Sequence, residues 1–143
     1  MAPRVLIFED NEILRSTLEA ILNEFGYEVF AFSNPGLCPV YDSADYKCSL
    51  DHACADIIIS DVDMPTKTGL EFIKDRKQKG CKIEYRTLIS GDWTDSSLKY
   101  AQELGCRVLH NPFDFEELLH WLHDCSKHIT PKRQLSNLFT KIN

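Results

Sequence analysis

Long apolar runs are missing from this 143-residue sequence. Stretches such as Val5–Phe8 and Ile57–Ile59 are far shorter than the roughly 20 residues that a membrane-spanning helix needs. The start of the chain also lacks the longer apolar stretch and the small-residue cleavage site of a secretory signal. We therefore expect a cytoplasmic protein that does not cross a membrane.

Positive charge is also in deficit. The sequence has 16 lysine and arginine residues against 22 aspartate and glutamate residues, which gives a formal net charge of −6. Because nucleic acids are polyanions, this sign opposes a whole-domain attraction to DNA or RNA. We expect neither a direct nucleic-acid partner nor a membrane partner for this domain.

Paired cysteine motifs are missing as well. The six cysteines include no C-x-x-C pair, and Cys38, Cys48 and Cys54 fall in one irregular stretch whose spacing matches no zinc pattern. We interpret the cysteines as mostly reduced, and these three as small apolar side chains buried in the fold.

The length and composition predict one folded domain. With 43% hydrophobic and 27% charged residues, 143 residues can bury a single core without disulfides or metals. We assign residues 1–129 to this domain and residues 130–143 to a basic tail. Apolar residues at helical spacing predict a short helix in the tail, which needs the domain, a second copy in a homodimer, or a partner to pack on. They are Leu135, Leu138, Phe139 and Ile142.

Short apolar runs alternate with segments of helical period, a pattern typical of a parallel sheet covered by helices on both faces. Strands are expected at residues 5–8, 28–32, 56–60, 83–89 and 107–110. Four helices are expected from Glu12 to about Gly26, from Gly69 to Lys79, from Thr94 or Asp95 to Gly105, and after a capping-box-like pair of Asp114 and Glu117. A fifth, short or displaced helix is expected within residues 33–55, where prolines weaken the helical signal.

Acidic residues follow two of the predicted strands. Glu9 and Asp10 come directly after the first strand, and Asp61 and Asp63 come after the third. Because ligands in open α/β sheets gather beyond the carboxyl ends of the strands, we expect these carboxylates to converge. Like charges repel unless protons or a cation intervene, and Mg²⁺ suits a few hard oxygen ligands. The plainer interpretation, that each acid caps the helix after it, explains single residues better than their joint placement.

Four motifs lie at the carboxyl ends of predicted strands. They are Ile7-Phe8-Glu9-Asp10-Asn11-Glu12, Ile59-Ser60-Asp61-Val62-Asp63-Met64-Pro65 with Gly69, Leu88-Ile89-Ser90-Gly91, and Asn111-Pro112-Phe113. Over about residues 4–128, the chain resembles the receiver domain of bacterial two-component response regulators. The resemblance implies an α/β, flavodoxin-like, doubly wound sheet of five parallel strands in the order 2-1-3-4-5, with five helices.

The resemblance also implies a chemistry. Asp61 would accept a phosphoryl group from a phosphohistidine on a histidine kinase or a histidine phosphotransfer protein, and a downstream protein would read the result. Glu9, Asp10 and Asp61 would hold Mg²⁺ together with the main-chain carbonyl of Asp63. Such a domain is not an enzyme in the usual sense, because at most it catalyses its own phosphorylation and dephosphorylation.

The phosphate-binding side of the resemblance is only partly matched. The Ser90 hydroxyl, next to Gly91, would bond a phosphoryl oxygen, although a serine at a strand end also caps its own turn. The family normally has a lysine where this chain has Asn111, and losing such a charged donor costs on the order of 2 to 4 kcal/mol of transition-state stabilisation. The family's switch aromatic is replaced by Val108, so its usual rearrangement is not assumed.

Lys67 follows Asp61 in the same loop and is a candidate substitute for the missing cation. A solvated loop lysine is the plainer interpretation of this residue.

Three functions are compatible with these residues. We expect a stand-alone receiver that signals by binding another protein or by passing phosphate onward. The two substitutions instead favour a pseudo-receiver that works without phosphate, whereas the retained acidic cluster argues against it. Asp61-Val62-Asp63 also resembles the catalytic pair of haloacid-dehalogenase-like phosphatases, but that family's other acids follow the nucleophile strand, and here they precede it.

Two weaker patterns carry open alternatives. Trp93, just after Ser90 and Gly91, is either exposed near a signalling surface or packed over the neighbouring helix. His120, Asp124 and His128 recur at four-residue spacing, which is more typical of a solvated helix face than of a metal site.

Overall fold

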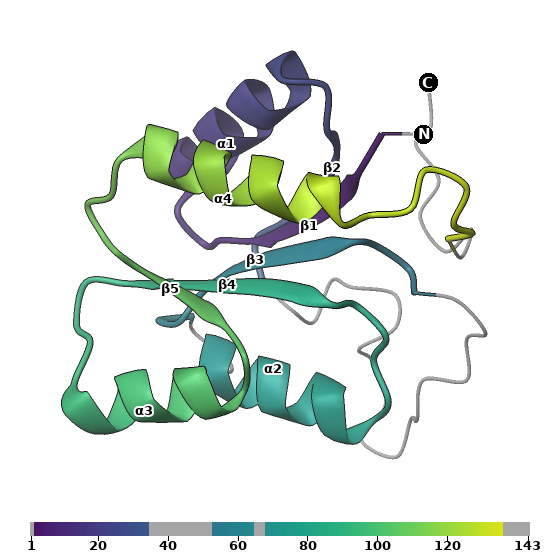
Figure 1. Cartoon of the computed structure of the whole chain (residues 1–143). Helices are drawn as coiled ribbons and strands as arrows, with labels where there is room; N and C mark the ends of the chain where they lie inside the picture. The colour runs from purple at the N-terminus through teal and green to yellow at the C-terminus, as the bar shows by residue number, and fades with distance from the viewer. Residues whose placement is uncertain (1, 35–52, 65–67, 136–143) are drawn as a thin grey trace.

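Five parallel strands form one sheet in the order β2-β1-β3-β4-β5, which confirms the predicted topology. The computed structural model describes residues 2–34, 53–64 and 68–135 (Figure 1). Its elements are β1 (Arg4–Phe8), α1 (Glu12–Glu24), β2 (Glu28–Phe32), β3 (Ile57–Asp61), α2 (Gly69–Gln78), β4 (Tyr85–Ser90), α3 (Asp95–Glu103), β5 (Arg107–His110) and α4 (Phe115–Lys127).

The number of helices differs from the expected five. The described residues contain four helices. The fifth was expected within residues 33–55, of which 35–52 lie outside the described residues together with Cys38 and Cys48. The strand expected at 83–89 begins two residues later, at Tyr85. Four of the five expected helices are therefore present, and the alternation of strands and helices is confirmed for the described residues.

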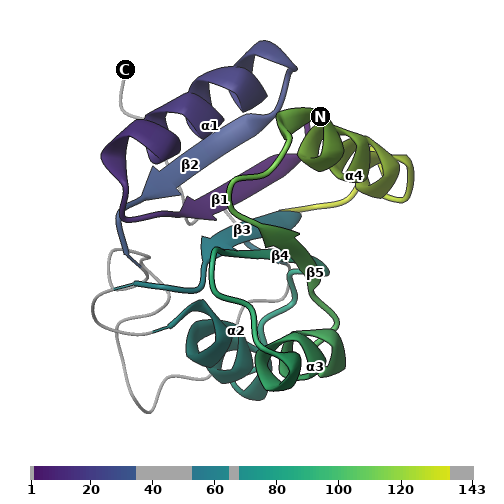
Figure 2. The same cartoon turned by 90° about the vertical axis from the view of Figure 1, so that its left-hand side faces the viewer.

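Two apolar layers hold the helices against the sheet. Alternate residues of a strand point to opposite faces, so β1 sends Val5 and Ile7 to one face and Leu6 and Phe8 to the other. The first face is covered by α1 and α4, and the second by α2 and α3 (Figure 2). The residues of β1 and β3 are almost completely buried because both faces are covered.

Side-chain caps begin all four helices. The Thr94 hydroxyl accepts from the Ser97 backbone N–H, and the Ser97 side chain accepts from the Thr94 backbone N–H, so α3 starts with a capping box. At α4 the expected box of Asp114 and Glu117 is wrong. Asp114 accepts from the Glu116 backbone N–H, whereas Glu117 pairs with Arg107 of β5 at 3.1 Å. The Glu117 carboxylate accepts from the Arg107 guanidinium and not from a backbone N–H at the start of the helix.

The first residues of the tail are attached to the amino-terminal edge of the sheet. Arg133 forms a two-pronged ion pair with the buried Asp56, with Nε 2.7 Å from Oδ1, and its guanidinium also reaches the Ala2 carbonyl. Asp56 in turn accepts from the Arg4 backbone N–H at 2.8 Å. The remaining tail residues, 136–143, lie outside the described residues, so the tail helix stays a prediction.

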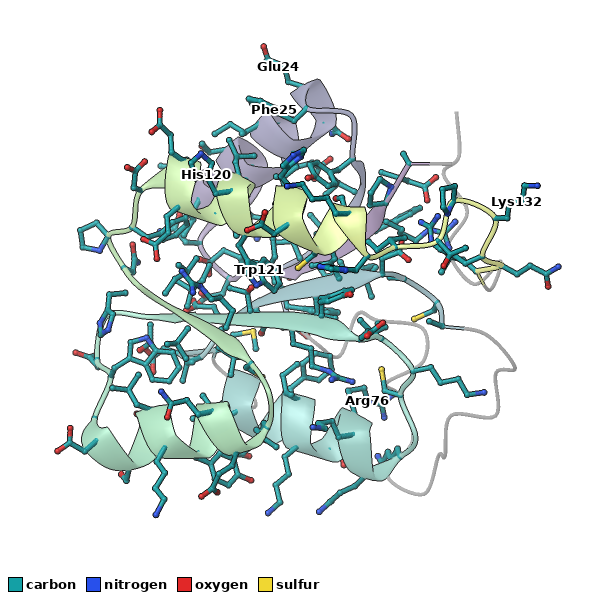
Figure 3. The ribbon with its side chains drawn as sticks, in the orientation of Figure 1. Glu24, Phe25, Arg76, His120, Trp121 and Lys132 are labelled. Atoms are coloured by element: carbon teal, nitrogen blue, oxygen red, sulfur yellow. The ribbon has the colours of Figure 1, made fainter. Side chains whose placement is uncertain are left out.

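We expect Arg133→Met to lower the free energy of unfolding by about 1–3 kcal/mol, because it leaves the Asp56 carboxylate buried with fewer donors. Lys132→Met makes the same change at an exposed neighbour (Figure 3) and should have little effect. Urea denaturation of both variants measures the difference. Equal losses in the two variants would show that the ion pair contributes nothing.

None of the helices in the described part of the chain combines the length and apolar character needed to cross a bilayer.

Candidate functional site

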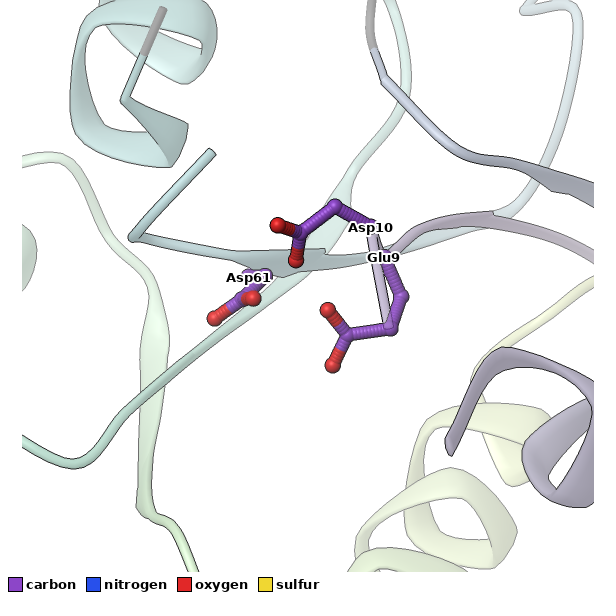
Figure 4. Close-up of side chains that lie close together, drawn as sticks. All are labelled: Glu9, Asp10 and Asp61. Atoms are coloured by element: carbon purple, nitrogen blue, oxygen red, sulfur yellow. The ribbon is translucent and has the colours of Figure 1, made fainter. Parts of the chain in front are cut away.

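Three carboxylates meet where β1 and β3 end. In the register of the two strands Phe8 lies beside Ser60, so Glu9 and Asp61 follow at the same edge. One carboxylate oxygen from each of Glu9, Asp10 and Asp61 lies within 4.8 Å of the others (Figure 4). The predicted convergence of these three acids is therefore confirmed. They form the only such candidate metal-ligating group among the described residues, so His120, Asp124 and His128 do not form one.

Burial and mutual repulsion favour the neutral forms of two of these acids. Glu9 is 3% exposed, and burial, together with its contact with the Asp61 carboxyl, raises the pKa of Glu9 to about 9. Burial also raises the pKa of Asp61, and the nearby Asp10 adds to the effect. A divalent cation relieves both causes at once, because it replaces lost solvation and cancels the repulsion.

We expect metal-free protein to lose stability as the pH rises from the ordinary carboxyl pKa of 4.5 toward about 9. In this window the folded protein keeps a proton on Glu9 that the unfolded chain has released, so raising the pH favours unfolding. Urea denaturation in EDTA at several pH values measures the slope. Glu9→Gln should flatten it, and Glu24→Gln, at an exposed helix end, should not. A slope unchanged by Glu9→Gln would contradict the expectation.

Main-chain contacts hold the acidic loop in place. Arg15, in the first turns of α1, donates from Nη1 to the Glu9 carbonyl at 2.9 Å, and the Glu9 backbone N–H donates to the Phe32 carbonyl of β2. The Asn11 side chain caps α1 by accepting from the Leu14 backbone N–H. The sequence analysis missed Arg15. The signal in the sequence was its position: Arg15 lies one helical turn after the cap Asn11, which directly follows the two acids.

Gly69 sets how closely α2 approaches the site. Its backbone N–H donates to the Val62 carbonyl at 2.9 Å. A Cβ atom at this position would lie 2.3 Å from the main-chain oxygen of Asp61 and 3.1 Å from a methyl carbon of Leu88. Only glycine lets the first turn of α2 lie against the backbone of Asp61.

Ser90 ends β4 on the other side of Asp61. It is 3% exposed, its hydroxyl donates to Asp63 Oδ2 at 3.3 Å, and it accepts from the Asp92 backbone N–H at 3.0 Å. The local cap expected of a strand-end serine is therefore present. The hydroxyl also contacts the side chain of Asp63, which lies two residues after Asp61.

The family model of the response regulator receiver domain matches residues 5–123. The chain belongs to this family. Receiver domains are signalling domains and not classical enzymes, and they bind Mg²⁺ at an acidic pocket. This match lends no support to the phosphatase alternative.

Relatives of known sequence agree with the assignment to the receiver family. The chain is 35% identical over 80 residues to the transcriptional regulatory protein DesR of Bacillus subtilis, covering 55% of this chain and 37% of DesR. It is 30% identical over 116 residues to the two-component response regulator PhoP of Pseudomonas aeruginosa, covering 80% of this chain and 48% of PhoP. The chain thus spans less than half the length of these relatives.

Among solved structures, the chemotaxis protein CheY4 of Vibrio cholerae has a similar fold. The TM-score is 0.68 at 26% identity, and the alignment covers 87% of this chain and 99% of CheY4. The similarity thus extends over a complete receiver domain.

Two residues of this receiver domain, Asn111 and Val108, differ from the family pattern. Asn111 is exposed at the end of β5, and its backbone N–H donates to the Ser90 carbonyl at 2.9 Å, so the residue borders the site but brings no positive charge. Val108 is half-buried on β5 and packs against the cluster under α2 and α3. Lys67, the candidate substitute cation, lies outside the described residues.

The described cysteines of this receiver domain are free thiols. Cys54, Cys106 and Cys125 are buried and Cys81 is partly buried. Burial raises the pKa of Cys106 and of Cys125 to about 11, so both thiols stay protonated near neutral pH. The interpretation of these residues as reduced, mostly buried side chains is confirmed for the described cysteines.

Proposed function

We propose that this receiver domain accepts a phosphoryl group on Asp61 from a phosphohistidine of a histidine kinase or phosphotransfer protein. The P–N bond to the histidine would break as a P–O bond to an Asp61 carboxylate oxygen forms, and the histidine nitrogen would leave with its electron pair. The observation that carries the proposal is the meeting of the Glu9, Asp10 and Asp61 carboxylates within 4.8 Å at the end of the sheet.

The residues present fit a divalent cation. Glu9, Asp10 and Asp61 would hold Mg²⁺ together with the main-chain carbonyl of Asp63, and the ion would neutralise charge on the phosphoryl oxygens. Three carboxylates offer hard oxygen ligands, and the repulsion that raises the pKa of Glu9 would be relieved by the ion. Asp61 is partly exposed at the end of β3, so its carboxylate is accessible to a partner's phosphohistidine.

Ser90 and Asn111 supply the phosphate-binding side. The buried Ser90 hydroxyl would turn from Asp63 to donate to a phosphoryl oxygen. Gly91 follows it without a side chain. The Asn111 side-chain amide can donate hydrogen bonds, but it cannot neutralise charge as an ammonium does. We expect transfer to be slow for this reason, and the signal to pass by contact with a downstream protein.

The test is incubation of the purified chain with Mg²⁺ and acetyl phosphate or phosphoramidate, followed by intact-mass measurement. We expect an added phosphoryl mass that is lost in Asp61→Asn and lost when EDTA replaces Mg²⁺. Asp124→Asn makes the same change at an exposed carboxylate of α4 and should keep the adduct.

A phosphate-independent pseudo-receiver is the second candidate, and Asn111 is the observation that favours it. It predicts that no adduct forms with any donor, while partner binding is unchanged in Asp61→Asn. An adduct that survives in Asp61→Asn would contradict the proposed acceptor.

A further inference from the structure

Trp93 connects the loop after Ser90 to the edge strand of the sheet. The indole Nε1–H donates to the main-chain carbonyl of Leu109, in β5, at 2.9 Å. The indole ring is half-buried and packs against the same apolar cluster as Val108, and it meets the His110 ring edge-on with 6.5 Å between centroids. The indole is therefore packed against the core and bonded to β5.

Only two residues separate Trp93 from Ser90. One of them, Asp92, is hydrogen-bonded to the Ser90 hydroxyl, so this contact depends on how the hydroxyl is oriented. The Ser90 hydroxyl has one proton, which it now donates to Asp63, and it accepts from the Asp92 backbone N–H. If the hydroxyl donates instead to a phosphoryl oxygen on Asp61, its hydrogen bond to Asp63 is lost. The turn of the hydroxyl also changes the contact with Asp92, the residue directly before Trp93.

Val108 is poorly suited to report such a change. A β-branched side chain is stiff at χ1 and too short to swing between an inner and an outer position. Trp93 has a large ring and also an N–H group that donates a hydrogen bond. A half-buried indole N–H that leaves its carbonyl must find another partner. Loss of the bond to Leu109 would therefore change the surroundings of the β5 backbone at that residue.

We propose that Trp93 is the coupling residue of this receiver domain: it passes the state of the Ser90 hydroxyl to β5, in the role that Val108 cannot fill. This inference rests on the proposed phosphorylation of Asp61. The change would be read on the outside of β5, where Arg107 and His110 are exposed. A partner protein that contacts this edge would then distinguish the two states.

The sequence contains two tryptophans, so Trp121→Phe leaves Trp93 as the only indole. We expect the indole N–H resonance of Trp93 in this variant to shift when acetyl phosphate is added to the Mg²⁺-loaded chain. The shift should be lost when Asp61→Asn is added. When Ser90→Ala is added instead, we expect no shift of the Trp93 resonance. Intact mass, measured on the same sample, shows that the adduct has formed.

Trp93→Phe, in the chain that keeps Trp121, tests the consequence. It retains an aromatic ring but not the N–H, so the adduct should still form while the backbone amide shifts of Leu109 and His110 on phosphorylation are lost. A stable adduct with an unchanged Trp93 resonance would overturn the coupling and leave the proposed function intact. A shift that persists in Ser90→Ala would also overturn it. Absence of any adduct would overturn both proposals.

Discussion

Asn111→Lys should speed transfer of a phosphoryl group to Asp61 by roughly 100-fold, which corresponds to about 2.7 kcal/mol of transition-state stabilisation. The backbone of Asn111 is bonded to that of Ser90, so a lysine here would extend from the rim of the site. An ammonium neutralises a phosphoryl oxygen, whereas the short amide offers only a weak dipole. Intact mass measured over time with Mg²⁺ and acetyl phosphate gives the two rates.

Asn111→Met is the matched control, because it adds an unbranched chain without the charge. This variant should phosphorylate no faster than the natural chain. An equal acceleration in both variants would show that chain length or loop packing, and not charge, limits the reaction. No acceleration in Asn111→Lys would mean that the cation is already supplied by another residue, and Lys67→Met in the natural chain would then test the candidate named above.

Gly69→Ala should lower the free energy of unfolding by about 2–3 kcal/mol and the midpoint of thermal unfolding by roughly 6–10 °C. The added Cβ would lie 2.3 Å from the Asp61 main-chain oxygen, so either α2 or the end of β3 has to move. Because that oxygen belongs to Asp61, the proposed phosphoacceptor, we also expect slower phosphorylation. Thermal and urea denaturation measure the first effect, and the time course of adduct formation measures the second.

Gly91→Ala is the control for stability. A Cβ at Gly91 would meet the Asn111 main-chain oxygen at 3.5 Å, which is an ordinary contact. Replacing a glycine where there is room also restricts the unfolded chain, so the stability of this variant should be unchanged or slightly higher. A Gly69→Ala protein as stable as Gly91→Ala would mean that α2 shifts away from Asp61 at no cost.

Local patterns in the sequence predicted most of the fold. The continuous apolar runs of β1 and β3 indicate two strands buried on both faces, and the glycines after α1 and α3 mark where those helices stop. The strand-end acids were also predicted, because parallel strands bring their carboxyl ends to one edge. The capping box expected for α4 was wrong, because the local sequence does not show that Arg107 of β5 pairs with Glu117.

By itself, the sequence determined where the apolar strands lie along the chain and which acids follow them. It also determined that Asn111 stands where the family has a lysine. Only the tertiary structure decided that the Glu9 and Asp61 carboxylates touch, that Gly69 must lie on the Asp61 backbone, and that the Trp93 indole is bonded to β5. The physical reason is that each of these contacts joins two different elements or loops of the fold. Their distances follow from the packing of the sheet and its helices, which no run of neighbouring residues encodes.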